Sequence, residues 1–175
     1  MSSRHTSSAF ALLLPLAFLP SPLVGQNTPP PGRSCAAAEY HQFDFWIGRW
    51  DVTLPNDKPA GSNRIEPILG GCALRETWSG AGGSDGTSYN AYDASRRRWH
   101  QTWVDNQGNL LLLEGGFANG RMTLEGETLD STGQAQRQRI VWQQTSPGHV
   151  RQLWETSSDG GATWTTAFDG RYVKR

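Results

Sequence analysis

The chain has 175 residues, and its 16 basic and 16 acidic side chains give a formal net charge of zero. A neutral chain has no electrostatic attraction for nucleic acid or for an anionic membrane surface, and its only basic run is Arg96-Arg97-Arg98. Eight tryptophans and twenty glycines indicate many buried rings and many tight turns, which is typical of a chain of short strands.

The first 25 residues have the pattern of a signal peptide. Arg4 and His5 give a weakly basic start, an apolar run covers residues 9–19, and small residues precede Gln26. The apolar run is too short and too interrupted by proline to span a membrane. We therefore expect residues 1–25 to be removed on export, which places the protein in the periplasm or outside the cell, without membrane attachment after cleavage.

Residues 26–40 include three consecutive prolines, and this composition predicts an extended linker. One helical turn over residues 36–41 is expected to close one end of the fold. The remaining residues, 41–175, suit a single domain with one core.

From Phe43 onward, strand-like stretches alternate with turn signals such as Asn119-Gly120. The ten predicted strands cover residues 48–54, 62–68, 72–78, 86–92, 98–104, 109–117, 121–129, 135–145, 149–156 and 163–173. Consecutive hairpins favour a meander, and closing a meander into a barrel removes its two edges. We therefore predict an all-β fold, a single up-and-down antiparallel β-barrel of about ten strands, with an open sandwich as the alternative.

The tripeptide Gly48-Arg49-Trp50 resembles the start of the lipocalin-like (calycin) barrels. In those barrels the tryptophan packs across the closed end, beneath a basic residue near the last strand. The resemblance implies structural roles for Gly48 and Trp50, with Arg171 or Arg175 over the indole ring.

More closely, the chain from about residue 35 to its end resembles a large family of exported bacterial proteins of unknown function. Members open with F-D-F-W-x-G-x-W and carry the patterns G-C, E-x-W, W-x-Q-x-W-V-D and S-x-D-G-G-x-T-W. In this chain the patterns stand at residues 43–50, 71–72, 76–78, 99–105 and 157–164. The resemblance implies a barrel and brings no established reaction.

Cys35 and Cys72 are the only cysteines, and an even count in an exported protein favours a disulfide over two buried thiols. The bridge would tie the linker to the third predicted strand. His41, His100 and His149 are isolated from one another in the sequence, so we predict no metal and no cofactor.

Residues 157–164 also fit the Asp-box pattern of sialidases, S-x-D-x-G-x-T-W. One copy cannot build a propeller, so we expect a structural turn. In that turn, Asp159 accepts backbone N–H groups and Trp164 folds back onto the sheet.

Strand alternation predicts one face that mixes rings with polar side chains. The tentative ligand-binding residues on this face are Glu76, Trp78, Trp99, Gln101, Trp103 and Gln152. Indoles supply apolar contact while amides and a carboxyl group orient hydrogen bonds. The expected partner is a small molecule with a ring-sized apolar face and hydrogen-bonding groups.

Three other functions stay open at this point. In the first, the protein has a structural role in the envelope, and the polar groups only form hydrogen bonds with one another. In the second, the outer face of the barrel binds another protein. Alternatively the protein is a hydrolase of a carbohydrate or polar metabolite, acting through Glu76 and a second carboxylate such as Asp105 or Glu155. No nucleophile elbow accompanies these residues, and the sequence does not indicate an oligomeric state.

Overall fold

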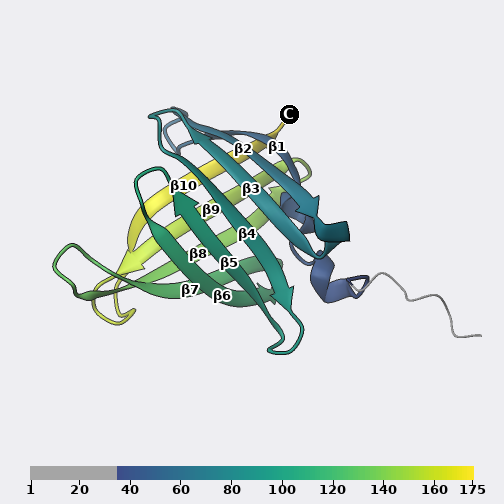
Figure 1. Ribbon diagram of the computed structural model, residues 1–175. Helices are drawn as coiled ribbons and strands as arrows, with labels where there is room; N and C mark the ends of the chain where they lie inside the picture. Colours follow the sequence, from purple (N-terminus) through teal and green to yellow (C-terminus); the bar gives the residue numbers. More distant parts are fainter. Residues whose placement is uncertain (1–34) are drawn as a thin grey trace, which may run out of the picture. The chain divides into compact units, whose positions relative to one another are not determined.

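The computed structural model of this protein describes residues 35–175 (Figure 1). The predicted signal peptide, 1–25, and most of the predicted linker, 26–40, lie outside the described residues. Three short 3-10 turns are present: η1 (Ala38–His41), η2 (Asp44–Trp46) and η3 (Leu69–Gly71). The strands are β1 (Gly48–Thr53), β2 (Pro59–Ile68), β3 (Ala73–Gly80), β4 (Asp85–Asp93), β5 (Arg98–Asp105), β6 (Leu110–Ala118), β7 (Arg121–Leu129), β8 (Ala135–Ser146), β9 (His149–Ser157) and β10 (Thr165–Lys174).

The ten strands form a closed barrel in which every strand pairs antiparallel with its chain neighbours. Closure comes from β1 and β10, which pair from Trp50 opposite Lys174 to Thr53 opposite Arg171. The predicted up-and-down barrel is confirmed, and it leaves neither end strand as a raw edge. Among the described residues, no helix is long and apolar enough to cross a membrane.

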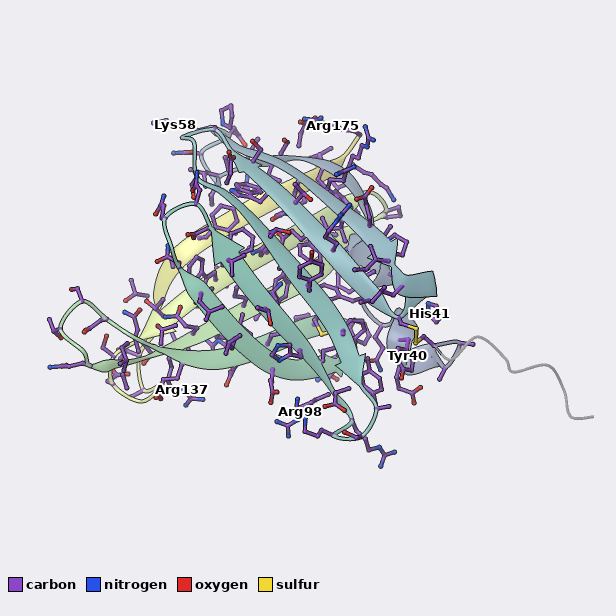
Figure 2. All side chains as sticks on the ribbon, viewed as in Figure 1. Tyr40, His41, Lys58, Arg98, Arg137 and Arg175 are labelled. Carbon is purple, nitrogen blue, oxygen red and sulfur yellow. A yellow bond between two sulfur atoms is a disulfide. The ribbon has the colours of Figure 1, made fainter. Side chains whose placement is uncertain are left out.

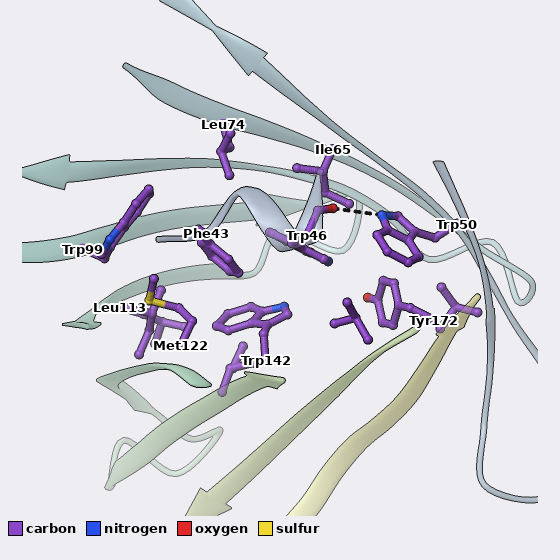
Figure 3. Close-up of a cluster of buried hydrophobic side chains, with 14 of the residues drawn as sticks. Phe43, Trp46, Trp50, Ile65, Leu74, Trp99, Leu113, Met122, Trp142 and Tyr172 are labelled. Carbon is purple, nitrogen blue, oxygen red and sulfur yellow. Dashed lines mark hydrogen bonds between the residues drawn. The ribbon is translucent and has the colours of Figure 1, made fainter. Parts of the chain in front are cut away.

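The N-terminal turns fill one end of the barrel, where β1 begins. Phe43 and Trp46 have no solvent exposure, and their rings stack with centroids 4.8 Å apart. Trp99 and Trp142 meet the Phe43 ring edge-on at 5.7 and 5.2 Å (Figure 3). We call residues 38–47 the plug, because they occupy the interior at this end only.

Trp50 is buried, with 1% of its surface exposed, as expected. Its Nε1 donates a hydrogen bond of 2.9 Å to the Trp46 carbonyl oxygen, drawn as the dashed line in Figure 3. The first strand is thereby fixed to the plug, and the burial of an indole with its N–H satisfied stabilises both.

The expectation that Arg171 or Arg175 covers the Trp50 ring is wrong. Lys174 covers it, with Nζ 5.6 Å from the ring centroid. Side chains alternate along a strand, so Lys174 lies on the same side of β10 as the buried Tyr172, whereas Arg171 and Arg175 lie on the other.

Both arginines instead pair with carboxylates on the outer surface. Arg171 lies 3.5 Å from the Asp57 carboxylate, and Arg175 binds Asp51. Gly48 has a φ of +148°, and a Cβ there would lie 2.8 Å from Cε of Lys174. Glycine at this position therefore permits both the backbone conformation and the approach of the lysine.

The predicted disulfide between Cys35 and Cys72 is present, with the Cα atoms 5.1 Å apart. It joins the residues just before η1 to the residue that follows η3. The covalent bond therefore holds the plug against the β2–β3 connection.

The predicted turn at residues 157–164 is also present. Asp159 accepts hydrogen bonds from the backbone and the side chain of Thr163 at 2.9 and 2.6 Å. The side-chain hydrogen bond from Thr163 contributes most, and the backbone bond adds to it. Together they hold the pKa of Asp159 well below its usual value. The Trp164 ring lies on the outer surface beneath the guanidinium of Arg139, which is 3.9 Å from the ring centroid, and this cation–π contact holds the turn against β8.

Candidate ligand-binding cavity

The half of the barrel that the plug leaves unfilled contains a cavity of about 400 Å3. Leu54, Ala81 and Gly82 line it, and they belong to the turns after β1 and β3. Since β1 begins at the plug, the turn that follows its end lies at the opposite end of the barrel. The cavity therefore reaches the end of the barrel away from the plug.

Rings from five strands make up much of the cavity wall. They are Trp78, Trp103, Trp142, Trp154, Phe168 and Tyr172. Trp78 and Phe168 meet edge to face at 5.9 Å, although β1 and β2 separate their strands around the barrel. These two rings therefore approach each other through the interior.

Five of the six residues predicted to bind a ligand line this cavity: Glu76, Trp78, Gln101, Trp103 and Gln152. Their ligand-binding role stays a prediction. Trp99 is not among the lining residues. It is buried against the plug, where its Nε1 donates to Gln42 at 3.2 Å, because it stands near the start of β5, at the plug end of the barrel.

A ladder of hydrogen-bonded, buried polar groups includes two of the lining residues, Glu76 and Gln101. Glu76 accepts hydrogen bonds of 2.7 Å from Asn63 and 2.6 Å from Ser88, one on each carboxyl oxygen. Asn90 donates to Ser88 at 2.9 Å, and Gln101 donates to Asn90 at 2.8 Å. The ladder thus consists of inward-facing side chains from four consecutive strands, β2 to β5. Glu76 carries its only carboxyl group, and the other members are neutral.

Burial raises the pKa of Glu76 to about 7, even though the hydrogen bonds from Ser88 and Asn63 favour its charged form. Burial, together with the negative charge of Glu76, also raises the pKa of the Tyr172 phenol. Tyr172 donates to Gln152, so it stays a neutral donor while Glu76 changes its charge near neutral pH.

Asp105 lies near the turn end of the same cavity and has the opposite character. Partial desolvation raises its pKa, but hydrogen bonds from the side chain and backbone of Asn109 and from the Gln107 backbone outweigh that effect and lower it. The carboxylate is therefore charged at neutral pH, and its hydrogen bonds hold the β5–β6 turn.

Three buried polar atoms in or near this interior have no hydrogen-bond partner among the described residues: Trp46 Nε1, Trp142 Nε1 and Asn63 Oδ1. Trp142 lines the cavity with 1% of its surface exposed. The Nε1 atom of Trp142 is itself covered by protein atoms, so the polar groups that the wall offers to a ligand come from side chains such as Glu76, Gln101 and Gln152.

Two glycines make room for the indoles of the wall. A Cβ on Gly61 would lie 2.8 Å from Cζ2 of Trp78, and one on Gly86 would lie 2.3 Å from Cζ2 of Trp103. Each ring therefore lies flat across a neighbouring strand. This packing keeps the indoles against the wall and leaves the space between them open.

The third candidate carboxylate, Glu155, is not in the cavity. It pairs with Arg139 at 2.9 Å, on the face of β9 opposite to Gln152. Among residues 35–175, no group of three or more His, Cys, Asp or Glu side chains is placed to hold a metal ion. Glu76 and Asp105 are the carboxyl groups of the cavity wall, and each is already hydrogen-bonded to its own neighbours.

Residues 38–174 match the family described as protein of unknown function, DUF1579. The chain belongs to this family. The match covers the plug and all ten strands, so the expectation of a family without an established function is confirmed. No curated protein matches the chain.

Sequence reasoning on this DUF1579 chain missed several wall residues. Trp154 shares strand parity with Gln152, and Ile140 and Trp142 alternate along β8, so a period-two pattern could have found all three. No such signal marks Asn63 and the other small polar groups of the ladder, because they are common in turns and on exposed faces.

Proposed function

We propose that this protein is an exported, lipocalin-like barrel that binds a small molecule inside its cavity. The observation that carries the proposal is the wall itself, in which indole rings surround a few polar side chains. A volume of about 400 Å3 falls within the usual range of small-molecule sites.

The wall suits a ligand with both a ring-sized apolar face and hydrogen-bonding groups. Flat indoles such as Trp78 and Trp103 provide contact area at low conformational cost. A purely apolar lipid fits less well, because it would desolvate polar lining groups such as Glu76 and Gln152 without offering them hydrogen bonds.

The cavity gives less support to the hydrolase hypothesis. A pair of catalytic carboxyl groups needs free access to the reacting bond. Here Asn63 and Ser88 occupy both oxygens of Glu76, and Asp105 holds its own turn. A structural role in the envelope remains the competing hypothesis, and it predicts no ligand.

Tryptophan fluorescence, titrated with a panel of metabolites, tests the binding site. A ligand should quench the emission, and Trp78→Phe and Trp103→Phe should each weaken its affinity. Trp164→Phe is the matched control, since that indole lies on the outer surface. Affinities that are unchanged in both cavity variants would place the ligand elsewhere and favour the structural role.

Export is tested separately. The signal-like residues 1–25 and the disulfide support an oxidising compartment. Sequencing the mature N-terminus from exported protein should find a start near Gln26. Exported protein that retains Met1 would contradict the signal peptide.

A further inference from the structure

We propose that the ligand of this cavity is an organic cation, a substituted ammonium group carried on an apolar body. The inference rests on the proposed function and specifies the charge of the ligand. It comes from the side chains of the wall, which supply acidic groups and ring faces but no basic group.

Charge is distributed unevenly between the cavity and the outer surface. Glu76 and Asp105 line the cavity, and the lining residues include no lysine, arginine or histidine. The chain as a whole has equal numbers of acidic and basic side chains, so this bias is a property of the cavity. Basic residues such as Arg98 and Arg137 project outward, where they pair with carboxylates (Figure 2).

An anionic ligand would therefore lack a counter-charge in the cavity. It would lie near the charged Asp105, and it would raise the cost of ionising Glu76. In a partly desolvated interior, such repulsion is stronger than it would be in water. A cation has the opposite effect, because it offsets both carboxyl groups.

The rings provide the second part of the argument. An aromatic face carries the negative end of the ring quadrupole, and cages of such faces bind quaternary ammonium groups. Six aromatic side chains line this cavity. Trp78 and Phe168 stand at 81° to each other, so they form a corner in which one ring face and one ring edge meet.

Protonation of Glu76 should couple to binding. The titratable groups that line the cavity are Glu76, Asp105 and Tyr172. The pKa of Asp105 is lowered and that of Tyr172 is raised, so neither changes charge near neutral pH. Glu76, with a pKa of about 7, is charged in most molecules at pH 8 and in few at pH 6. Affinity for a cation should therefore rise up to about tenfold between these two pH values.

Three probes of the same shape test the charge preference: choline, the neutral alcohol dimethylbutanol in which carbon replaces nitrogen, and the anion dimethylbutanoate. Affinities are measured by tryptophan fluorescence and by calorimetry at pH 6 and pH 8. At pH 8, choline should bind about tenfold or more tightly than the alcohol, and the anion should bind more weakly than either.

Variants identify the carboxyl group responsible. Glu76→Gln should remove the pH dependence and most of the preference for choline. Glu66→Gln is the control, because Glu66 pairs with Arg64 and Arg75 on the outer surface, and it should leave both unchanged. Urea unfolding of each variant checks that it is folded.

Two results would overturn the cation inference. If the alcohol or the anion binds as tightly as choline, the site accepts small molecules without regard to positive charge, and the proposed binding function stands. If none of the three probes binds, the cation inference also fails, and the metabolite titration then decides the binding function by itself.

Discussion

Glu76 is a carboxyl group with 4% of its surface exposed, and this burial destabilises the folded protein when the group is charged. Its pKa is about 7 in the folded protein and 4.5 in an exposed setting, so the folded state binds the proton more tightly. The stability that protonated Glu76 contributes is fully present below pH 4.5 and is lost as the pH rises through about 7. The difference between these pKa values corresponds to about 3 kcal/mol.

We predict that Glu76→Gln stabilises the protein at pH 8 and changes its stability little at pH 5. Asn63 can rotate its amide, so its unpartnered Oδ1 can accept from the new glutamine N–H. Urea unfolding of both proteins at the two pH values measures the effect. Glu66→Gln is the control. The arginine partners of Glu66, Arg75 first, lower its pKa, so removing this carboxylate should not stabilise the protein at pH 8. A Glu76→Gln variant less stable at pH 8 than the wild type would contradict the assignment.

Trp50 and Lys174 test the closed end of the barrel. Trp50→Ala should cost about 3–5 kcal/mol, as a large-to-small change in a packed core. Lys174→Met should cost up to about 1 kcal/mol through the lost cation–π contact, whereas Arg171→Met should change stability by less than about 0.5 kcal/mol. Thermal unfolding ranks the three variants. If Arg171→Met lost more stability than Lys174→Met, Arg171 and not Lys174 would be the residue that covers the Trp50 ring.

The error at this end illustrates how sequence reasoning fails for single residues. Gly48 and Trp50 identified the closed end through the resemblance of Gly48-Arg49-Trp50 to the start of the lipocalin-like barrels. The sequence did not specify which C-terminal basic residue meets the ring. That choice depends on the register of β10, where a bulge between Thr166 and Phe168 shifts the pairing.

At the scale of strands, turn residues and period-two alternation were enough to predict all ten strands and the meander. The start of β2 differs from its prediction, because Pro59 pairs with Thr53 beyond a bulge at Ala60 in β2. The turn η2 was not predicted. Its three residues place Trp46 in the core, and such a short turn has too few residues for a periodic signal.

Strand β4 carries a prediction about the cavity wall. Gly86→Ala would bring a methyl group within 2.3 Å of the Trp103 ring, so the ring must move into the cavity. Overpacking of this kind should cost about 1–3 kcal/mol and should shift the tryptophan emission. Gly116→Ala on β6 is the matched control, because a Cβ there meets no atom within 4 Å. Equal stabilities in the two variants would mean that Trp103 does not lie against Gly86.

At the scale of the whole barrel, the two ends have different roles. The plug end holds Phe43, Trp46 and Trp50 in a filled core, while the other end leaves the cavity. The disulfide spans a sequence separation of 37 residues, and this segment contains the plug, β1 and β2. Because β1 pairs with β10, the same covalent loop includes the strand that closes the barrel.

We therefore predict that replacing both Cys35 and Cys72 by alanine costs about 3–4 kcal/mol, from the chain entropy that the loop restricts in the unfolded state. The loss should be uneven. Hydrogen exchange should accelerate most at the plug and in the β1–β10 pairs. Without the disulfide, the N-terminal segment can detach from the β2–β3 connection, and these hydrogen bonds are then exposed first. Pairs between β7 and β8, which lie across the barrel from the disulfide in strand order, serve as the internal reference. Uniform acceleration in all strands would show that the disulfide stabilises only the global fold, and that it does not hold the plug or the β1–β10 pairing locally.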